Sequence, residues 1–252
     1  MRTISVVGIG AGDPEHITVQ AINTLNTVDV VFMVDKGDRQ RAAADLRRDI
    51  CERYITRPGY RVVTAEEIPR DRQAASYRMA VDVWRRRRAD IYERLITDEL
   101  GEDEHGAFLA WGDPAIYDST LHVLDEVLAR GTVSFDVQVI PGISSIQALA
   151  ARHKISLTRT GRPLHITTGR LLAQGFPDNA DDVVVMLDAG CAFRDIDTGG
   201  ARIYWGAYVG SPDEILAEGD AKEAGPEIAA QREAARREHG WIMDSYLLRR
   251  TT

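Results

Sequence analysis

The chain has 252 residues, 44% of them hydrophobic, and a formal net charge of -8. This length allows one large domain or two medium domains with real cores, and the acidic balance argues against a protein that binds nucleic acid or anionic membranes in general. The two cysteines, Cys51 and Cys191, lie far apart without a metal-ligand spacing, so the sequence suggests neither a disulfide framework nor a zinc site.

The chain opens with a short apolar run at residues 3–8, which predicts a buried strand. It lacks the charged segment and long apolar core of a signal peptide, and no stretch reaches membrane-spanning length. We therefore expect a cytoplasmic protein without a membrane partner. A glycine loop at residues 8–14 ends in Gly12-Asp13-Pro14, and a helical pattern follows over residues 17–25.

A second buried run at residues 30–34 ends at Asp35-Lys36-Gly37. With the first strand and helix it forms a βαβ unit, whose strands should be parallel. Further along, residues 39–54 are charged and helix-prone, and residues 61–64 resemble a third strand. A long helix is predicted over residues 74–100.

Four consecutive arginines lie in this long helix, but helical geometry points them in different directions. Arg88 falls within the apolar stripe of the helix. A cation in that position needs a partner. We expect a structural role, with a carboxylate or backbone carbonyls within reach. The alternative is an arginine that serves the substrate.

The central stretch, residues 106–120, runs from a strand through Gly112-Asp113-Pro114 into a helix. Glycine lets the backbone approach a ligand, and the acid beside proline can hold the turn or act as a base. A third loop of this kind, Pro141-Gly142-Ile143-Ser144-Ser145, follows a strand at residues 135–140 and precedes a helix at 146–152. Because strand ends hold the chemistry of α/β proteins, the loops suggest one ligand cleft.

From the pattern we predict two α/β domains. Residues 1–142 should form an N-terminal domain with a parallel sheet, and residues 143–252 a smaller C-terminal domain with a mixed sheet. The C-terminal domain should contain three strands, a charged helix and a last segment, at 164–168, 182–187, 202–207, 226–237 and 241–248.

Common site motifs are absent or incomplete. The first glycine loop mimics a dinucleotide fingerprint, but Asp13 stands at the third glycine position, which disfavours NAD. No lysine and hydroxyl follow the glycines, as a phosphate-binding Walker loop requires. The six histidines have no paired ligand spacing, so no metal is implied, and no serine lies in a nucleophile elbow.

Taken together, the three glycine loops resemble the tetrapyrrole methylases, which are S-adenosylmethionine-dependent enzymes of corrin and sirohaem synthesis. The resemblance covers the whole chain, and one departure is Ala11, where many members carry proline. Further segments are similar to the members that act in aerobic cobalamin synthesis: Asp35-Lys36-Gly37, Trp111, and residues 186–190, 204–208 and 240–246.

This resemblance implies the two-domain tetrapyrrole methylase fold, a homodimer, and a polycarboxylate corrin precursor as substrate. The implied reaction methylates precorrin-5 at C1 and releases acetate. The methyl donor S-adenosylmethionine, which leaves as S-adenosylhomocysteine, should lie in the cleft between the domains. By position, the residues expected to contact it are Ala11, Trp111, Gly112, Asp113, Ile116, Ser144, Ser145, Met186, Leu187 and Tyr208 with the loop after it.

Loss of the acetyl group requires an activated or oriented water, and the candidates are Asp35, Tyr117 and His122. The carboxylates of the substrate point to basic residues at loop ends, with a solvated surface charge as the alternative for each: Lys36, Arg39, Arg159, Arg162 and Arg170. Other acceptors in the same fold class, such as another tetrapyrrole, an RNA or a protein, remain open. The non-enzyme alternative is a module that binds a nucleotide-like ligand without turnover. Net charge disfavours RNA.

Overall fold

The computed structural model describes residues 1–35, 41–67 and 77–250. The chain separates into two compact units. Unit 1 contains Met1–Gly10 and Pro14–Ile143, and unit 2 contains Ala11–Asp13 and Ser144–Thr252. The short Ala11–Asp13 segment of the first glycine loop therefore packs with unit 2, although most of the N-terminal chain packs in unit 1.

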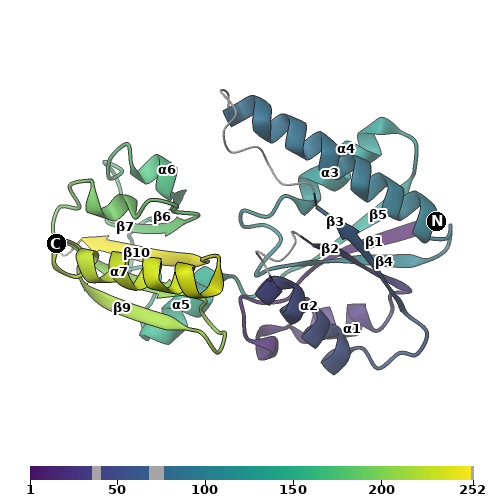
Figure 1. Ribbon diagram of the computed structural model, residues 1–252, viewed down its shortest axis with the longest axis horizontal. Helices are drawn as coiled ribbons and strands as arrows, with labels where there is room; N and C mark the ends of the chain where they lie inside the picture. The colour runs from purple at the N-terminus through teal and green to yellow at the C-terminus, as the bar shows by residue number, and fades with distance from the viewer. Residues whose placement is uncertain (36–40, 68–76, 251–252) are drawn as a thin grey trace. The chain divides into compact units, whose positions relative to one another are not determined.

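Unit 1 is built on a five-stranded sheet of order β3-β2-β4-β1-β5 (Figure 1). All of its neighbouring strands are parallel, as the βαβ pattern predicts. The strands are β1 (Arg2–Gly8), β2 (Val30–Asp35), β3 (Arg61–Glu66), β4 (His105–Ala110) and β5 (Phe135–Ile140). Their carboxyl ends share one edge, where the glycine loops begin.

Helices cover both faces of this sheet (Figure 1). One face packs against α3 (Tyr77–Glu99) and α4 (Thr120–Arg130) through a core that includes Phe32, Tyr92 and Phe108. The other face packs against α1 (Val19–Leu25) and α2 (Arg41–Tyr54). A short 3-10 helix, η1 (Pro14–His16), precedes α1.

Unit 2 contains a mixed sheet of order β6-β7-β10-β8-β9, in agreement with the prediction of a mixed sheet. Only β6 and β7 are parallel, and the other neighbours are antiparallel. The strands are β6 (Leu164–Thr168), β7 (Asp182–Met186), β8 (Ala201–Ala207), β9 (Ile215–Asp220) and β10 (Asp244–Arg250). The helices are α5 (Ser145–His153), α6 (Gly169–Leu172), η3 (Ala192–Arg194) and α7 (Ala221–His239).

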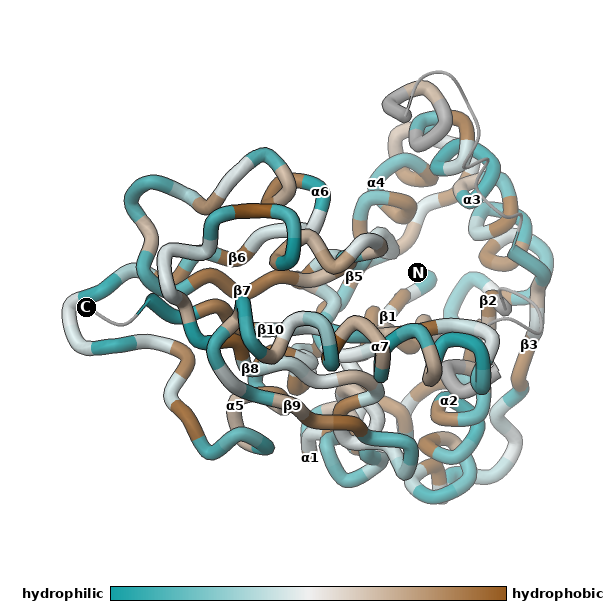
Figure 2. Tube along the Cα trace, turned by 60° about the vertical axis from the view of Figure 1, so that its left-hand side comes forward, coloured by the Kyte–Doolittle hydropathy of each residue, from teal (hydrophilic) through white to brown (hydrophobic). Residues whose placement is uncertain are grey.

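The apolar residues gather on the strands of both sheets, and hydrophilic and hydrophobic residues alternate along α7 (Figure 2). This alternation is typical of a helix that covers a sheet with one face. Among the described residues, no helix is long and apolar enough to cross a membrane.

Candidate active site

Three glycines bring the loops of unit 1 together at the carboxyl edge of the sheet. A Cβ atom on Gly8 would lie 2.6 Å from the backbone nitrogen of Gly142, and a Cβ atom on Gly142 would lie 2.1 Å from the carbonyl oxygen of Gly112. The loops after β1, β4 and β5 therefore pack backbone against backbone, and only glycine fits. We call Gly8, Gly112 and Gly142 the glycine junction.

Asp113 fastens this junction. Its Oδ1 accepts a hydrogen bond from the Ala115 N–H at 2.8 Å, and its Oδ2 accepts one from the Gly142 N–H at 2.9 Å. A two-way backbone bridge joins Gly10 and Gly112 beside it. Both carboxylate oxygens of Asp113 hold loops in place, which favours the structural role over that of a base.

Three of the expected site residues have left-handed backbone. Tyr117 has φ 52°, Leu187 has φ 54° and Tyr208 has φ 49°, among five non-glycine residues with positive φ in the described chain. Such backbone costs about 1–2 kcal/mol per residue, and strain of this kind gathers at ligand sites. Leu187 also exposes 65% of its surface although it is apolar.

In unit 2, Ala11 is buried beside Ala148, Leu149 and Val209, so its methyl group belongs to a small core. Ser144 is buried as well and precedes α5, where it forms a capping box with Gln147. Ser145 begins the helix.

The strand ends of β6 and β7 meet next to Leu187. Thr168 and Met186 are register partners, and Thr168 Oγ1 is buried without a hydrogen bond to the described residues. Asp188 fixes the turn after Leu187, because its Oδ2 accepts hydrogen bonds from the Ala192 N–H at 2.7 Å and from the Tyr246 hydroxyl at 2.6 Å. Thr168 was not predicted as a site residue, because it stands out only through this pairing and its burial.

Tyr208 has a structural side chain. Its hydroxyl donates to the Trp241 carbonyl oxygen at 2.5 Å, and its backbone N–H donates to Met243 at 2.9 Å. Burial raises the pKa of Tyr208 to about 12, so the phenol stays neutral. The Tyr208 ring is therefore engaged within unit 2, and contact of a ligand with Tyr208 or the loop after it stays a prediction.

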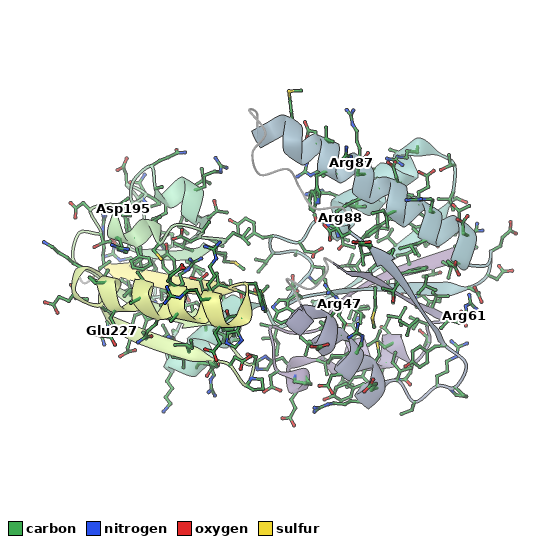
Figure 3. The ribbon with its side chains drawn as sticks, in the orientation of Figure 1. Arg47, Arg61, Arg87, Arg88, Asp195 and Glu227 are labelled. Carbon is green, nitrogen blue, oxygen red and sulfur yellow. The ribbon has the colours of Figure 1, made fainter. Side chains whose placement is uncertain are left out.

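A polar pocket of about 170 Å³ lies in unit 1, at the carboxyl ends of β2 and β4. Arg88 on α3 and Arg47 on α2 reach it from helices on opposite faces of the sheet (Figure 3). Glu67, Tyr117 and other residues complete the lining: Phe32, Val34, Trp84, Tyr92, Phe108, Leu109, Asp118, Ser119 and Thr120.

The candidates for water activation are not all brought together. Tyr117 lines the pocket, and its ring is half-exposed. His122 is exposed on α4 and is not among the lining residues. Asp35 ends β2, but its side chain lies outside the described residues.

Two of the expected substrate residues are engaged with acids. Arg159 Nε contacts the fully buried Asp182 at 2.9 Å, and Arg162 Nη1 contacts Asp181 at 3.2 Å. Arg159 is therefore tied into the fold, whereas Arg162 is exposed. Arg170 is exposed at the start of α6, and Lys36 and Arg39 lie outside the described residues.

The family model for Tetrapyrrole (Corrin/Porphyrin) Methylases matches residues 3–225. Over 250 residues the chain is 50% identical to a precorrin-6A synthase [deacetylating] from Sinorhizobium sp, and this match covers 99% of the chain and 96% of the relative.

Solved structures show the same architecture. A cobalamin-synthesis-related protein from Corynebacterium diphtheriae aligns with a TM-score of 0.85 and 36% identity, over 99% of this chain and 98% of the other. A uroporphyrin-III C-methyltransferase from Thermus thermophilus, solved with S-adenosylhomocysteine, aligns with a TM-score of 0.60 and 20% identity, over 98% and 96%. The second likeness shows the fold alone.

Proposed function

The chain belongs to the tetrapyrrole methylases, and from this we propose that it methylates precorrin-5 at C1 and releases the acetyl group as acetate, forming precorrin-6A. The observation that carries the proposal is the similarity to the Sinorhizobium synthase, which extends over nearly the full length of both chains. The family and the enzyme class agree with the resemblance drawn from the three glycine loops.

The methyl donor in this proposal is S-adenosylmethionine, whose sulfonium would supply an electrophilic methyl group. The residues present suit such a ligand, because the glycine junction leaves bare backbone and Leu187 exposes an apolar side chain. We assign donor contacts to Ala11, Trp111, Gly112, Asp113, Ile116, Ser144, Ser145, Met186, Leu187 and the loop after Tyr208. We add Thr168, whose buried hydroxyl has no partner among the described residues.

These residues would work by positioning. Methyl transfer is an in-line displacement, so a donor held at the correct angle contributes more than an acid or a base. The loop at Asp113, which two backbone hydrogen bonds hold in place, is a support of that kind. The choice of Asp35, Tyr117 or His122 for water activation stays a prediction, as do the homodimer, the cytoplasmic location and the absence of a nucleic-acid or membrane partner.

A panel of acceptors tests the function. The purified protein is incubated with methyl-labelled S-adenosylmethionine and, separately, precorrin-5, earlier precorrins and ribosomal RNA. We expect label to enter precorrin-5 alone. Label in RNA, or tight donor binding with no transfer to any tetrapyrrole, would overturn the proposal in favour of another acceptor or a binding module.

A further inference from the structure

Arg88 has more hydrogen-bond donors than partners. Its side chain is 8% exposed and lines the polar pocket of unit 1. Two of its five N–H groups donate to hydroxyls, one to Ser119 and one to Tyr92, the latter at 2.8 Å. Nε is buried and makes no hydrogen bond with the described residues.

The neighbouring acid does not use that donor. Glu67 is the carboxylate next to Arg88, but its Oε1 lies 3.6 Å from Nε, beyond hydrogen-bond distance. The Arg88 guanidinium is instead held by neutral groups, since it also lies 4.9 Å from the Trp84 ring centre and 5.3 Å from that of Tyr92. The expected acid is present and balances the charge of Arg88, whose Nε–H is still available to another oxygen.

Tyr117 offers a second donor to the same pocket. Its hydroxyl makes no hydrogen bond within the described chain, and burial raises its pKa, so it stays a neutral O–H group. Tyr117 and Ser119 lie on the loop that begins with Gly112 and Asp113. The pocket and the glycine junction therefore share one loop.

The size of the pocket limits what can enter. Ligands of drug size need cavities of roughly 300–1,000 Å³, whereas this pocket measures about 170 Å³. A tetrapyrrole ring is too large. A small group with an oxygen acceptor suits two spare donors beside a buried carboxylate.

We propose that this pocket receives the acetyl group of the substrate, and this rests on the function proposed above. Arg88 and Tyr117 donate hydrogen bonds to the acetyl oxygen, and Glu67 accepts the first proton of the attacking water. The water oxygen bonds to the acyl carbon, and the bond between that carbon and the macrocycle breaks. The electron pair of that bond stays on the ring carbon, which then takes the methyl group from the sulfonium, and acetate leaves while both water protons reach solvent.

The test compares acetate release, methyl transfer and donor affinity in Arg88→Met, Arg88→Lys and Glu67→Gln. The two Arg88 variants should lower acetate release about 100-fold, the loss typical of removing one oxyanion donor, and Glu67→Gln should lower it about 100-fold or more, as the loss of a general base does. Methyl transfer should fall in step, and unreacted precorrin-5 should accumulate. Donor affinity should stay within a few-fold of wild type. The matched control is Arg130→Met, because Arg130 ties α3 to α4 through Asp90, Glu93 and Glu126 outside the pocket. Arg130→Met should leave acetate release and methyl transfer near their wild-type rates.

A binding measurement on the wild-type protein tests the pocket even if the variants fail to fold. In the wild-type protein labelled with 5-fluorotryptophan, acetate should shift the Trp84 resonance, and chloride at equal ionic strength should not. Acetate release at the wild-type rate in a folded Arg88→Met, a loss of donor affinity as large as the loss of acetate release, or an unmoved Trp84 resonance would each contradict the pocket assignment. A wild-type protein that methylates no precorrin would instead contradict the proposed function, and the acetate titration still reports on the pocket.

Discussion

Leu187 holds an exposed apolar side chain on strained backbone, with φ 54° and 65% exposure. Glycine at this position should relieve about 1–2 kcal/mol of strain and lose about 0.5–1 kcal/mol to chain entropy. We expect Leu187→Gly to keep or slightly raise the free energy of unfolding and to weaken S-adenosylmethionine binding. Denaturant unfolding and calorimetry measure the two effects.

Lys154→Gly is the control for this comparison. Lys154 is also left-handed and exposed, at the end of α5, but it is not an expected site residue. Lys154→Gly should change the free energy of unfolding as much as Leu187→Gly does, and it should keep the donor affinity of the wild type. Equal donor affinity in both variants would mean that Leu187 does not contact the donor.

We expect Asp113 to stabilise the fold rather than to act as a catalytic base. Asp113→Ala removes the acceptor for two backbone N–H groups, one exposed and one half-buried. A typical hydrogen bond contributes about 0.5–1.5 kcal/mol to stability, so the two together contribute about 1–3 kcal/mol. We expect a loss of unfolding free energy in this range and weaker donor binding. Asp136→Ala, an exposed change on β5, should stay within about 0.5 kcal/mol of wild type. An unchanged stability for Asp113→Ala would return the base role to consideration.

The sequence predicted where the loops lie, but not which hydrogen bonds their individual atoms make. The Gly-Asp-Pro pattern predicted a tight turn, whereas the bond from Gly142 to Asp113 depends on two strand ends that meet only in the folded sheet. Gly112 has φ 71°, so a bulkier residue there strains folding as well as ligand binding. Thr168 could not be predicted as a site residue from the sequence, because only its pairing with Met186 in the folded sheet places it beside the expected site residues.

Among the elements, β4 starts at a partly buried histidine that should make unit 1 sensitive to acid. His105 Nε2 lies 2.8 Å from Ser5 Oγ on β1. Burial lowers the pKa of His105 below its ordinary value of 6.5, partly opposed by Asp29. The unfolded chain then binds more protons below pH 6.5, so stability is present above that pH and is lost as the pH falls through the folded value.

We therefore expect the free energy of unfolding to decline below pH 6.5, and to decline less steeply in His105→Gln. Urea denaturation across this range measures both slopes. Parallel curves for the two proteins would show that His105 does not contribute.

The hydrophobic periodicity of the sequence predicted most of the helices and strands. Each one that it missed or misplaced has a local cause. The strand β9 was not predicted, because Ile215–Asp220 is acidic and only partly buried at a sheet edge, where it pairs with β8 alone. The helix α7 starts at Ala221 rather than at Pro226, because Asp220 caps it by accepting from the Lys222 N–H at 2.9 Å. Pro226 lies inside the helix, where it lacks the N–H for an intrahelical hydrogen bond, so the sequence favoured a helix that starts at this proline rather than one that runs through it.

Across the molecule, binding of the polyanionic substrate should depend on the surface charge of the protein, whereas binding of S-adenosylmethionine should not. Arg162→Glu should raise the KM for precorrin-5 several-fold, with an effect that shrinks at high salt, and leave donor affinity unchanged. Arg202→Glu is the control, because Arg202 pairs with Glu218 across β8 and β9 and is not an expected substrate residue. A salt-independent KM, or equal effects of the two variants, would show that Arg162 is only a surface charge.

In the proposed reaction, one enzyme exchanges an acetyl group for a methyl group on the same substrate. The most direct measurement is mass spectrometry of the product formed from precorrin-5 and methyl-labelled S-adenosylmethionine, with acetate quantified in the same sample. We predict one labelled methyl gained, one acetyl lost, and acetate equal in amount to S-adenosylhomocysteine. A product that gains the methyl and keeps the acetyl, or an unlabelled precorrin-5, would contradict the account.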